Sequence, residues 1–160
     1  VRVCMGSPEF RPDLIPVAAE GEHFIQQPVY IDGEKYLVTA LSVGNPHAVI
    51  FVDNVDAIDL ASLGPKFENH TLFPERINTE FVQIINRKTL KMRVWERGET
   101  LACGTGATAS LVAAAVCGFT GPAAKLILAG GELFIEWDRD ENLLYMTGPA
   151  EFVFDGEIKL

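Results

Sequence analysis

The sequence has little positive charge and little cysteine. Its 160 residues hold 13 Lys and Arg against 22 Asp and Glu, a formal net charge of −9 at pH 7. Nucleic-acid binding needs clustered Lys and Arg side chains, so we expect no nucleic-acid partner. The three cysteines, Cys4, Cys103 and Cys117, are odd in number and lack C-x-x-C spacing. They argue against a disulfide-rich secreted scaffold and favour reduced thiols in the cytoplasm.

Several catalytic and targeting motifs are also absent. The chain has no G-x-S-x-G elbow, P-loop or H-E-x-x-H helix, so no motif supports a hydrolase, an NTPase or a zinc enzyme. It opens on Val1-Arg2-Val3-Cys4-Met5, without an initiator Met, a basic region or an apolar region, which is not a signal peptide. We interpret this opening as a strand entered from an upstream segment.

The residues that are present predict a mixed α+β domain. Hydrophobic residues make up 48% of the chain, enough for a substantial core. Asp32-Gly33 is typical of a hairpin turn, and Asp59 can cap a helix that continues to about Glu68. Strands are expected at 48–52, 79–85, 89–95, 124–128, 132–137, 142–146 and 151–158. Many strands with few helices do not suit a strand–helix alternation.

The segment Gly104–Cys117 is the main helical prediction. It is rich in Ala, Leu and Val, carries no charge, and is followed by Gly118 as a stop signal. A helix that is apolar nearly all round must be buried on most sides. Fourteen residues rise only about 21 Å, too short for a membrane span. We therefore expect mixed and antiparallel sheets wrapped around this central helix, and no membrane partner.

The start of that helix has the most chemical information. Cys103-Gly104-Thr105-Gly106 places a thiol and small residues at a helix N-terminus, where unpaired N–H groups attract anions and stabilise a thiolate. We interpret it as an anion-binding helix end beside a reactive cysteine. The alternative is that Cys103 is a small buried hydrophobe and the glycines serve only tight packing.

Residues 104–109 also match G-x-G-x-x-A, the dinucleotide-binding fingerprint. That motif needs a strand directly before it and an acidic residue roughly 20 positions on. Here Arg97–Thr100 separates the strand from the glycines, and the next acidic residue is Glu132. We therefore expect no dinucleotide cofactor.

Several loops, each unremarkable alone, together resemble the signature blocks of the diaminopimelate epimerase family. In chain order they are Gly44–His47, Phe73–Asn78, Arg93–Gly98, Glu99–Ala107, Leu144–Ala150 and Phe154–Ile158. The opening Val3–Gly6 is similar to the strand that begins the family's second half, although Cys4 stands where the family usually has Asp or Asn. The likeness covers essentially all 160 residues.

The resemblance implies a cofactor-free enzyme, without a metal, that interconverts LL- and meso-diaminopimelate for lysine and peptidoglycan synthesis. Two cysteines face opposite sides of the α-carbon; one removes its proton and the other returns a proton to the opposite face. Two opposed groups invert the centre, whereas a single group returns the proton to the side it left. Such an enzyme is expected in the cytoplasm, or in the plastid if the source is a plant.

The resemblance assigns site residues one by one. Cys103 takes the role of one acid–base cysteine, and Gly104 and Thr105 contact the substrate carboxylate. His47 and Glu96 tune the ionisation of the thiols. The residues that recognise the far amino-acid end of the substrate are Asn45, Asn78, Glu96 and Arg97. The guanidinium of Arg97 can bind a distal carboxylate with two hydrogen bonds.

The sequence departs from the family in two ways. The loop between Gly98 and Glu99 is two residues shorter, which would pull Cys103 relative to Glu96. The family's first half, which holds the second catalytic cysteine, is not in these 160 residues. We therefore interpret residues 1–160 as a C-terminal domain with half an active site, inactive alone. Residues 151–160 would form a terminal strand that crosses to the N-terminal domain and is less stably held without it.

Two alternatives stay open at this stage. A proline- or hydroxyproline-type racemase, or another isomerase of the same fold, would keep the helix-end Cys103 but need not keep Asn45, Asn78 and Arg97. A non-catalytic fragment would bind an amino acid without turnover. The expected partners are diaminopimelate, the N-terminal domain and a second copy of the chain in a homodimer.

Overall fold

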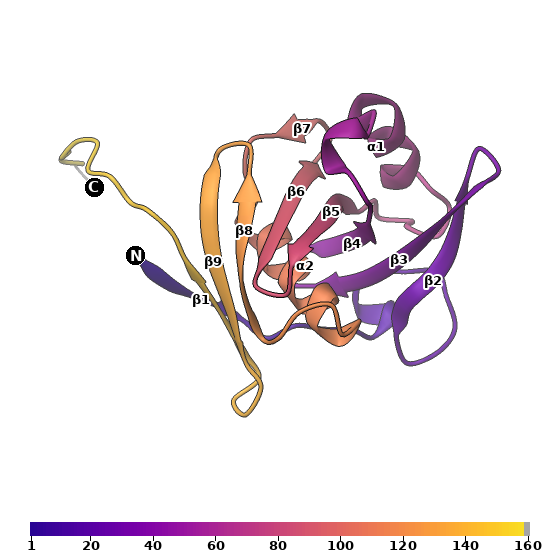
Figure 1. Ribbon diagram of the computed structural model, residues 1–160, viewed down its shortest axis with the longest axis horizontal. Helices are drawn as coiled ribbons and strands as arrows, with labels where there is room; N and C mark the ends of the chain where they lie inside the picture. The colour runs from indigo at the N-terminus through magenta and orange to yellow at the C-terminus, as the bar shows by residue number, and fades with distance from the viewer. Residues whose placement is uncertain (159–160) are drawn as a thin grey trace.

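The computed structural model describes residues 1–158 and shows a mixed α+β fold with a large mixed sheet and few helices (Figure 1). The two α-helices are α1 (Leu60–Glu68) and α2 (Gly104–Val116), and two short 3-10 helices span Pro12–Leu14 and Val55–Ala57. The strands are β1 (Arg2–Gly6), β2 (Phe24–Ile31), β3 (Glu34–Ser42), β4 (Pro46–Phe51), β5 (Asn78–Asn86), β6 (Thr89–Trp95), β7 (Glu99–Thr100), β8 (Ala123–Leu128), β9 (Gly131–Asp138) and β10 (Leu143–Thr147). The hairpin at Asp32-Gly33 and the helix capped by Asp59 are confirmed.

The sheet runs in the order β1-β10-β9-β8-β6-β5-β4-β3-β2, and the short β7 pairs with β6. Most neighbours are antiparallel, but β4 pairs with β5 and β6 with β8 in parallel. Short turns join the neighbouring antiparallel strands β3 and β4, β5 and β6, and β8 and β9. The parallel neighbours are connected through helices: α1 lies between β4 and β5, and α2 between β6 and β8. Strands β4, β5 and β6 are therefore side by side. These three strands position the polar residues discussed below.

Strands β4 and β5 are buried on both faces through their first residues, which suits the apolar run of β4 from Ala48 to Phe51. On β4, Val49 belongs to one apolar cluster, whereas Ala48 and Ile50 belong to another. On β5, Val82 and Phe81 divide in the same way. The first cluster packs against α2 and the second against α1, so the side chains of each strand alternate between two cores.

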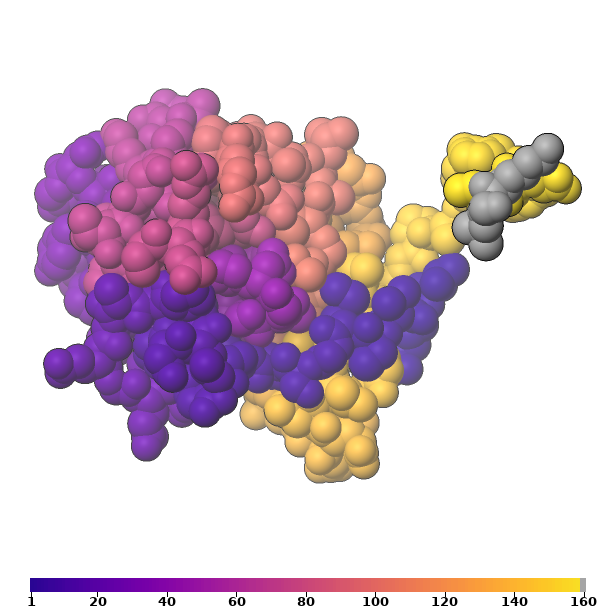
Figure 2. Space-filling view, turned by 180° about the vertical axis from the view of Figure 1, so that it is seen from behind, coloured from indigo at the N-terminus to yellow at the C-terminus, as the bar shows by residue number. Residues whose placement is uncertain are grey.

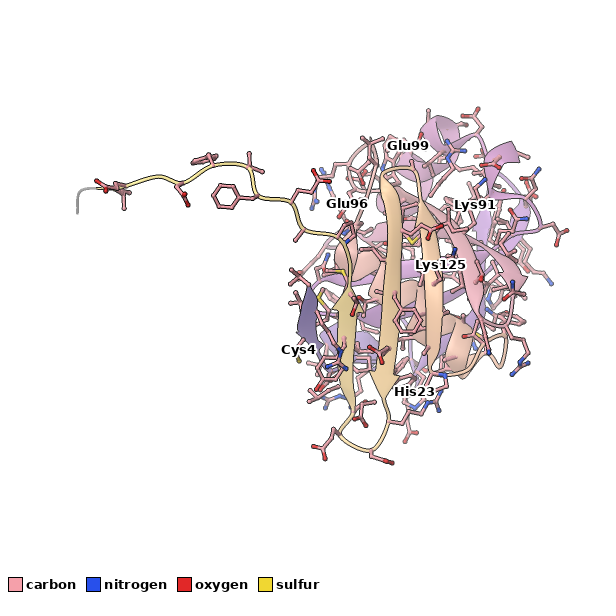
Figure 3. The ribbon with its side chains drawn as sticks, turned by 60° about the vertical axis from the view of Figure 1, so that its left-hand side comes forward. Cys4, His23, Lys91, Glu96, Glu99 and Lys125 are labelled. Atoms are coloured by element: carbon pink, nitrogen blue, oxygen red, sulfur yellow. The ribbon has the colours of Figure 1, made fainter. Side chains whose placement is uncertain are left out.

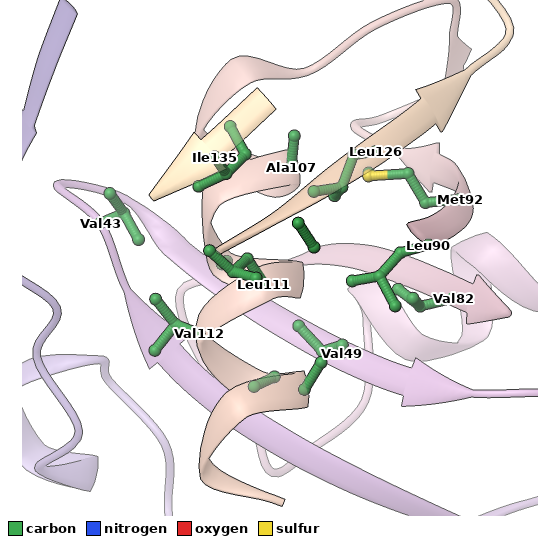
Figure 4. Packing of buried hydrophobic residues seen from close by; sticks show 14 of the residues in the cluster. Val43, Val49, Val82, Leu90, Met92, Ala107, Leu111, Val112, Leu126 and Ile135 are labelled. Atoms are coloured by element: carbon green, nitrogen blue, oxygen red, sulfur yellow. The ribbon is translucent and has the colours of Figure 1, made fainter. Parts of the chain in front are cut away.

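Helix α2 has ten consecutive buried residues, from Gly106 to Ala115. It contacts strands from β3 to β10, with the exception of β7, and is seen behind the sheet in Figure 1. Figure 4 shows Leu111 and Val112 of this helix among Val49, Leu90 and Ile135 of the strands. Because each turn of α2 is covered by sheet, the helix has no polar stripe toward solvent.

The expected strand at 151–158 is not formed. Residues 148–158 have no regular secondary structure, those from 149 on are exposed, and they leave the body next to β1 as an extended segment (Figures 1 and 2). Phe152 and Phe154 have 80% and 79% of their surface exposed. A strand needs a hydrogen-bonding neighbour, and β10 is already paired on both sides, with β1 and β9. Residues 159–160, the rest of that prediction, lie outside the described residues.

Candidate functional site

The polar residues of the candidate site come from three adjacent strands and meet the start of α2. In the parallel register, His47 of β4 lies beside Asn78 of β5, and Val49 lies beside Glu80. Side chains two positions apart share a face, so His47, Asn78 and Glu80 all face α2, as do Val49 and Val82. Glu96 follows β6 two residues after Val94, which is on that same face. The alternation of three strands thus brings these groups to one end of the helix.

Cys103 is the N-cap residue of α2 and lies at the centre of this group. Its Sγ accepts a hydrogen bond from the backbone N–H of Gly106 at 3.2 Å and lies 3.5 Å from Thr105 Oγ1. The thiol donates to Glu96 Oε1 at 3.2 Å. The N–H groups of Gly104 and Thr105 open the helix, and no intrahelical carbonyl is available to them. These contacts give the helix end both a thiol and free backbone donors.

The thiol of Cys103 is not activated by the helix in this structure. Burial raises the pKa of Cys103 to about 12, while its contacts with Thr105 and the Gly106 N–H lower the pKa and do not compensate. Only 7% of the residue is exposed. The helix N-terminus thus does not lower the pKa of this thiol below its ordinary value in the chain as described, because removal of water from the thiol outweighs the local dipole.

Three donors converge on Glu96, which the short β6–β7 turn holds close to the thiol. Asn78 Nδ2 donates to Glu96 Oε1 at 3.1 Å, Thr100 Oγ1 donates to Oε2 at 3.1 Å, and the Cys103 thiol donates to Oε1. The turn is tight: the Glu96 N–H donates to Gly98 O at 2.8 Å, and Arg97 has a φ of +62°. The shortened loop therefore does not separate Glu96 from Cys103.

His47 and Glu80 form a fully buried pair behind this group. Their side chains have 0% of their surface exposed, and His47 Nδ1 lies 2.7 Å from Glu80 Oε1. The other ring nitrogen, Nε2, lies 3.0 Å from Asn45 Oδ1. Both nitrogens of His47 thus have hydrogen-bond partners, and within residues 1–158 neither forms a hydrogen bond with Cys103. Burial raises the pKa of Glu80, against a smaller lowering by His47.

A pocket of about 190 Å³ opens beside this group. Four separate segments of the chain form it, and its lining includes acidic and basic side chains: Pro16, Asn45, Pro46, Glu75, Arg76, Ile77, Asn78 and Arg97 line it. Three of the four residues predicted to recognise the far end of the substrate therefore line this pocket. The fourth, Glu96, does not line the pocket but binds Asn78, which does.

Sequence reasoning missed Glu80. A signal for it was present, since Glu80 shares its strand face with the apolar residues Val82 and Ile84. A carboxyl group on an apolar strand face is rare unless it is paired, and here it is paired with His47. The specific role of Gly106 was also not predicted. A Cβ there would lie 2.6 Å from Glu80 Oε1 and 3.1 Å from Cys103 Sγ, so the glycine leaves room for both groups.

No group of three or more His, Cys, Asp or Glu side chains suited to a metal ion occurs among residues 1–158. Within the same residues, neither helix is long and apolar enough to cross a membrane.

Comparison with known proteins shows strong similarity to one family. The family model for diaminopimelate epimerase matches residues 39–153. A diaminopimelate epimerase of Acetivibrio thermocellus is 56% identical over 162 residues, covering 100% of this chain and 58% of that protein. Those of Desulforapulum autotrophicum and of Methanococcus maripaludis strain C6 are 52% and 48% identical, covering 99% and 100% of this chain and 56% and 58% of theirs.

A solved structure of a predicted epimerase from Pseudomonas aeruginosa has the same fold, with a TM-score of 0.55 at 14% identity over 96% of this chain and 58% of that one. The chain thus spans a little over half the length of the relatives it matches. The matched blocks include the loops that hold Asn45, Asn78, Glu96 and Cys103. The chain belongs to the diaminopimelate epimerase family.

Proposed function

We propose that this chain is the C-terminal domain of a cofactor-independent diaminopimelate epimerase and contributes half of its active site. The observation that carries the proposal is the contact of Cys103 with Glu96 at the start of α2, beside a pocket lined by Asn45, Asn78 and Arg97. The relatives named diaminopimelate epimerase are longer than this chain by about two fifths of their length. That additional part would supply the N-terminal domain and the second cysteine.

In the proposed reaction Cys103 starts as a thiol. Its raised pKa suits a proton donor, which protonates the α-carbanion after the second cysteine, as a thiolate, has removed the proton from the other face. In the reverse direction Cys103 must lose its proton first. Glu96 Oε1, which accepts the S–H, is the nearest base for that step. The N–H groups of Gly104 and Thr105 would bind the carboxylate next to the reacting carbon.

The pocket favours diaminopimelate over a small cyclic amino acid. Arg97, Asn45 and Asn78 would bind the second amino-acid group of the substrate, several carbons from the reacting centre. A proline-type racemase acts on a substrate without such a group, so it has no use for this pocket. We assign Arg97 to the distal carboxylate, because a guanidinium binds carboxylate through two parallel hydrogen bonds.

A chimera tests the proposal. Residues 1–160 replace the matching segment of the Acetivibrio thermocellus epimerase, and exchange of the α-hydrogen of diaminopimelate is followed in D2O. We expect exchange and epimerisation in the chimera, and loss of about 10²–10⁴-fold in the Cys103→Ala variant. The parent enzyme, with its own cysteine at the matching position replaced by alanine, is the matched control.

The two-residue shortening needs its own variant. The alignment with the Acetivibrio relative covers 162 positions against the 160 residues of this chain, so two aligned positions have no counterpart in this chain. A second chimera therefore receives two small residues between Gly98 and Glu99. Activity only in the lengthened chimera would assign the defect to the loop. A folded chimera inactive in both forms, or exchange unaffected by Cys103→Ala, would refute the proposed function.

A further inference from the structure

Glu80 is the most deeply buried carboxyl group of the described chain and has no role in the chemistry above. Its side chain is 0% exposed and makes one hydrogen bond, through Oε1, to His47 Nδ1. The second oxygen, Oε2, has no hydrogen-bond partner among residues 1–158. A buried charged carboxylate with an unpartnered oxygen is costly in free energy. The question is therefore which atom, Glu80 Oε1 or His47 Nδ1, carries the hydrogen between them.

The contact with Asn45 determines one proton on His47. The amide oxygen Oδ1 of Asn45 can only accept a hydrogen bond, so the His47 Nε2 at 3.0 Å must carry a hydrogen and donate it. Two arrangements of the other nitrogen remain. Either a neutral Glu80 donates its O–H to an unprotonated Nδ1, or a protonated Nδ1 donates to a Glu80 carboxylate. The pair is uncharged overall in both.

The surroundings of the two carboxyl groups decide between them. Glu96 accepts hydrogen bonds from Asn78, Thr100 and Cys103. Glu80 has no such set of donors; burial raises its pKa, and the nearby charge of Glu96 raises it further. The proton therefore belongs on Glu80, whose unpartnered Oε2 is then the neutral carbonyl oxygen.

We propose that Glu80 is a positioning residue: through His47 it holds the amide of Asn45 with its oxygen inward and its Nδ2 hydrogens toward the pocket. Only the identity of the ligand rests on the proposed function. Asn78 is fixed the other way round, because its Nδ2 donates to Glu96 and leaves Oδ1 for the pocket that it lines. The two amides thus present a donor and an acceptor, which fits one carboxylate and one ammonium of an amino-acid group.

Nitrogen-15 NMR of the 160-residue chain tests the buried arrangement directly, because the two nitrogens of His47 differ in shift according to which carries hydrogen. We expect a neutral ring with hydrogen on Nε2. Glu80→Gln keeps this tautomer, since the Gln amide can donate to Nδ1. Glu80→Leu provides no donor, and we expect a mixture of tautomers and broadened Asn45 side-chain amide signals. Thr79→Val, on the same strand, removes an unpartnered buried hydroxyl and should leave the His47 spectrum unchanged.

Hydrogen on both nitrogens of His47 would overturn the assignment of the proton to Glu80. A ring unchanged in Glu80→Leu, or a tautomer with hydrogen on Nδ1 alone, would overturn the positioning role. Titration with meso-diaminopimelate then tests the consequence: Asn45→Asp presents no N–H, and we expect binding at least about tenfold weaker, with Glu80→Leu weakened and Glu80→Gln near the wild type. Loss of binding in Glu80→Gln equal to that in Glu80→Leu would refute the link. If the wild-type chain binds no diaminopimelate, the ligand assignment fails while the NMR result still judges Glu80.

Discussion

The two ends of α2 lie in opposite surroundings, although they belong to one uninterrupted helix. The later turns, around Leu111 and Val112, pack in the apolar cluster between the helix and the sheet. The first turn, at Cys103 and Gly106, contacts two carboxyl groups within a few ångströms. The apolar turns stabilise the position of the helix, and the first turn then holds groups that do not stabilise the fold by themselves. Sites of this kind depend on rigid elements fixed elsewhere.

Removal of side-chain volume from the apolar end should have the largest effect. Leu111 is fully buried, and Leu111→Ala leaves a cavity that the surrounding strands cannot fill. We expect a loss of about 3 kcal/mol in the free energy of unfolding, measured by urea denaturation. Leu37→Ala is the matched control, because Leu37 is 43% exposed on β3, and it should cost less than about 1 kcal/mol. Equal losses in the two variants would contradict the role of α2 as the packed centre.

Addition of a methyl group at the polar end should have an intermediate effect. The Cβ of Gly106→Ala would lie 2.6 Å from Glu80 Oε1, which the bond to His47 keeps from moving aside. We expect a loss of about 1–2 kcal/mol in spite of the better helix propensity of alanine. Gly121→Ala, with no atom within 4 Å of the new Cβ, is the control and should be nearly neutral. A Gly106→Ala variant as stable as the control would show that the side chains of Glu80 and Cys103 can move aside to make room for the methyl group.

The same contrast shows what could be predicted from the sequence. Periodicity and turn residues predict β4, β5 and β6 and the span of α2, because these depend on neighbours in the chain. The resemblance predicts Asn45, Asn78 and Arg97, which the structure places around one pocket. Two features could not be predicted from the sequence, because they depend on distant parts of the fold. Burial by surrounding strands decides the pKa of Cys103, and a pairing partner decides whether residues 151–158 form a strand.

The effect that is smallest at neutral pH concerns the Cys103 thiol itself, because it appears only at high pH. Its pKa is raised to about 12 in the folded chain, above the ordinary value near 9. The folded state therefore keeps a proton that the unfolded state releases, and this contribution to stability is complete below pH 9 and lost as the pH rises toward 12. We expect the unfolding free energy of the wild type to fall more steeply than that of Cys103→Ser between pH 9 and 11. Cys4→Ser, which changes an exposed thiol on β1 (Figure 3), should follow the wild type. A Cys103→Ser curve parallel to the wild type would mean that the thiol has an ordinary pKa. Water would then reach the first turn of α2, in contrast to the buried turns around Leu111 and Val112.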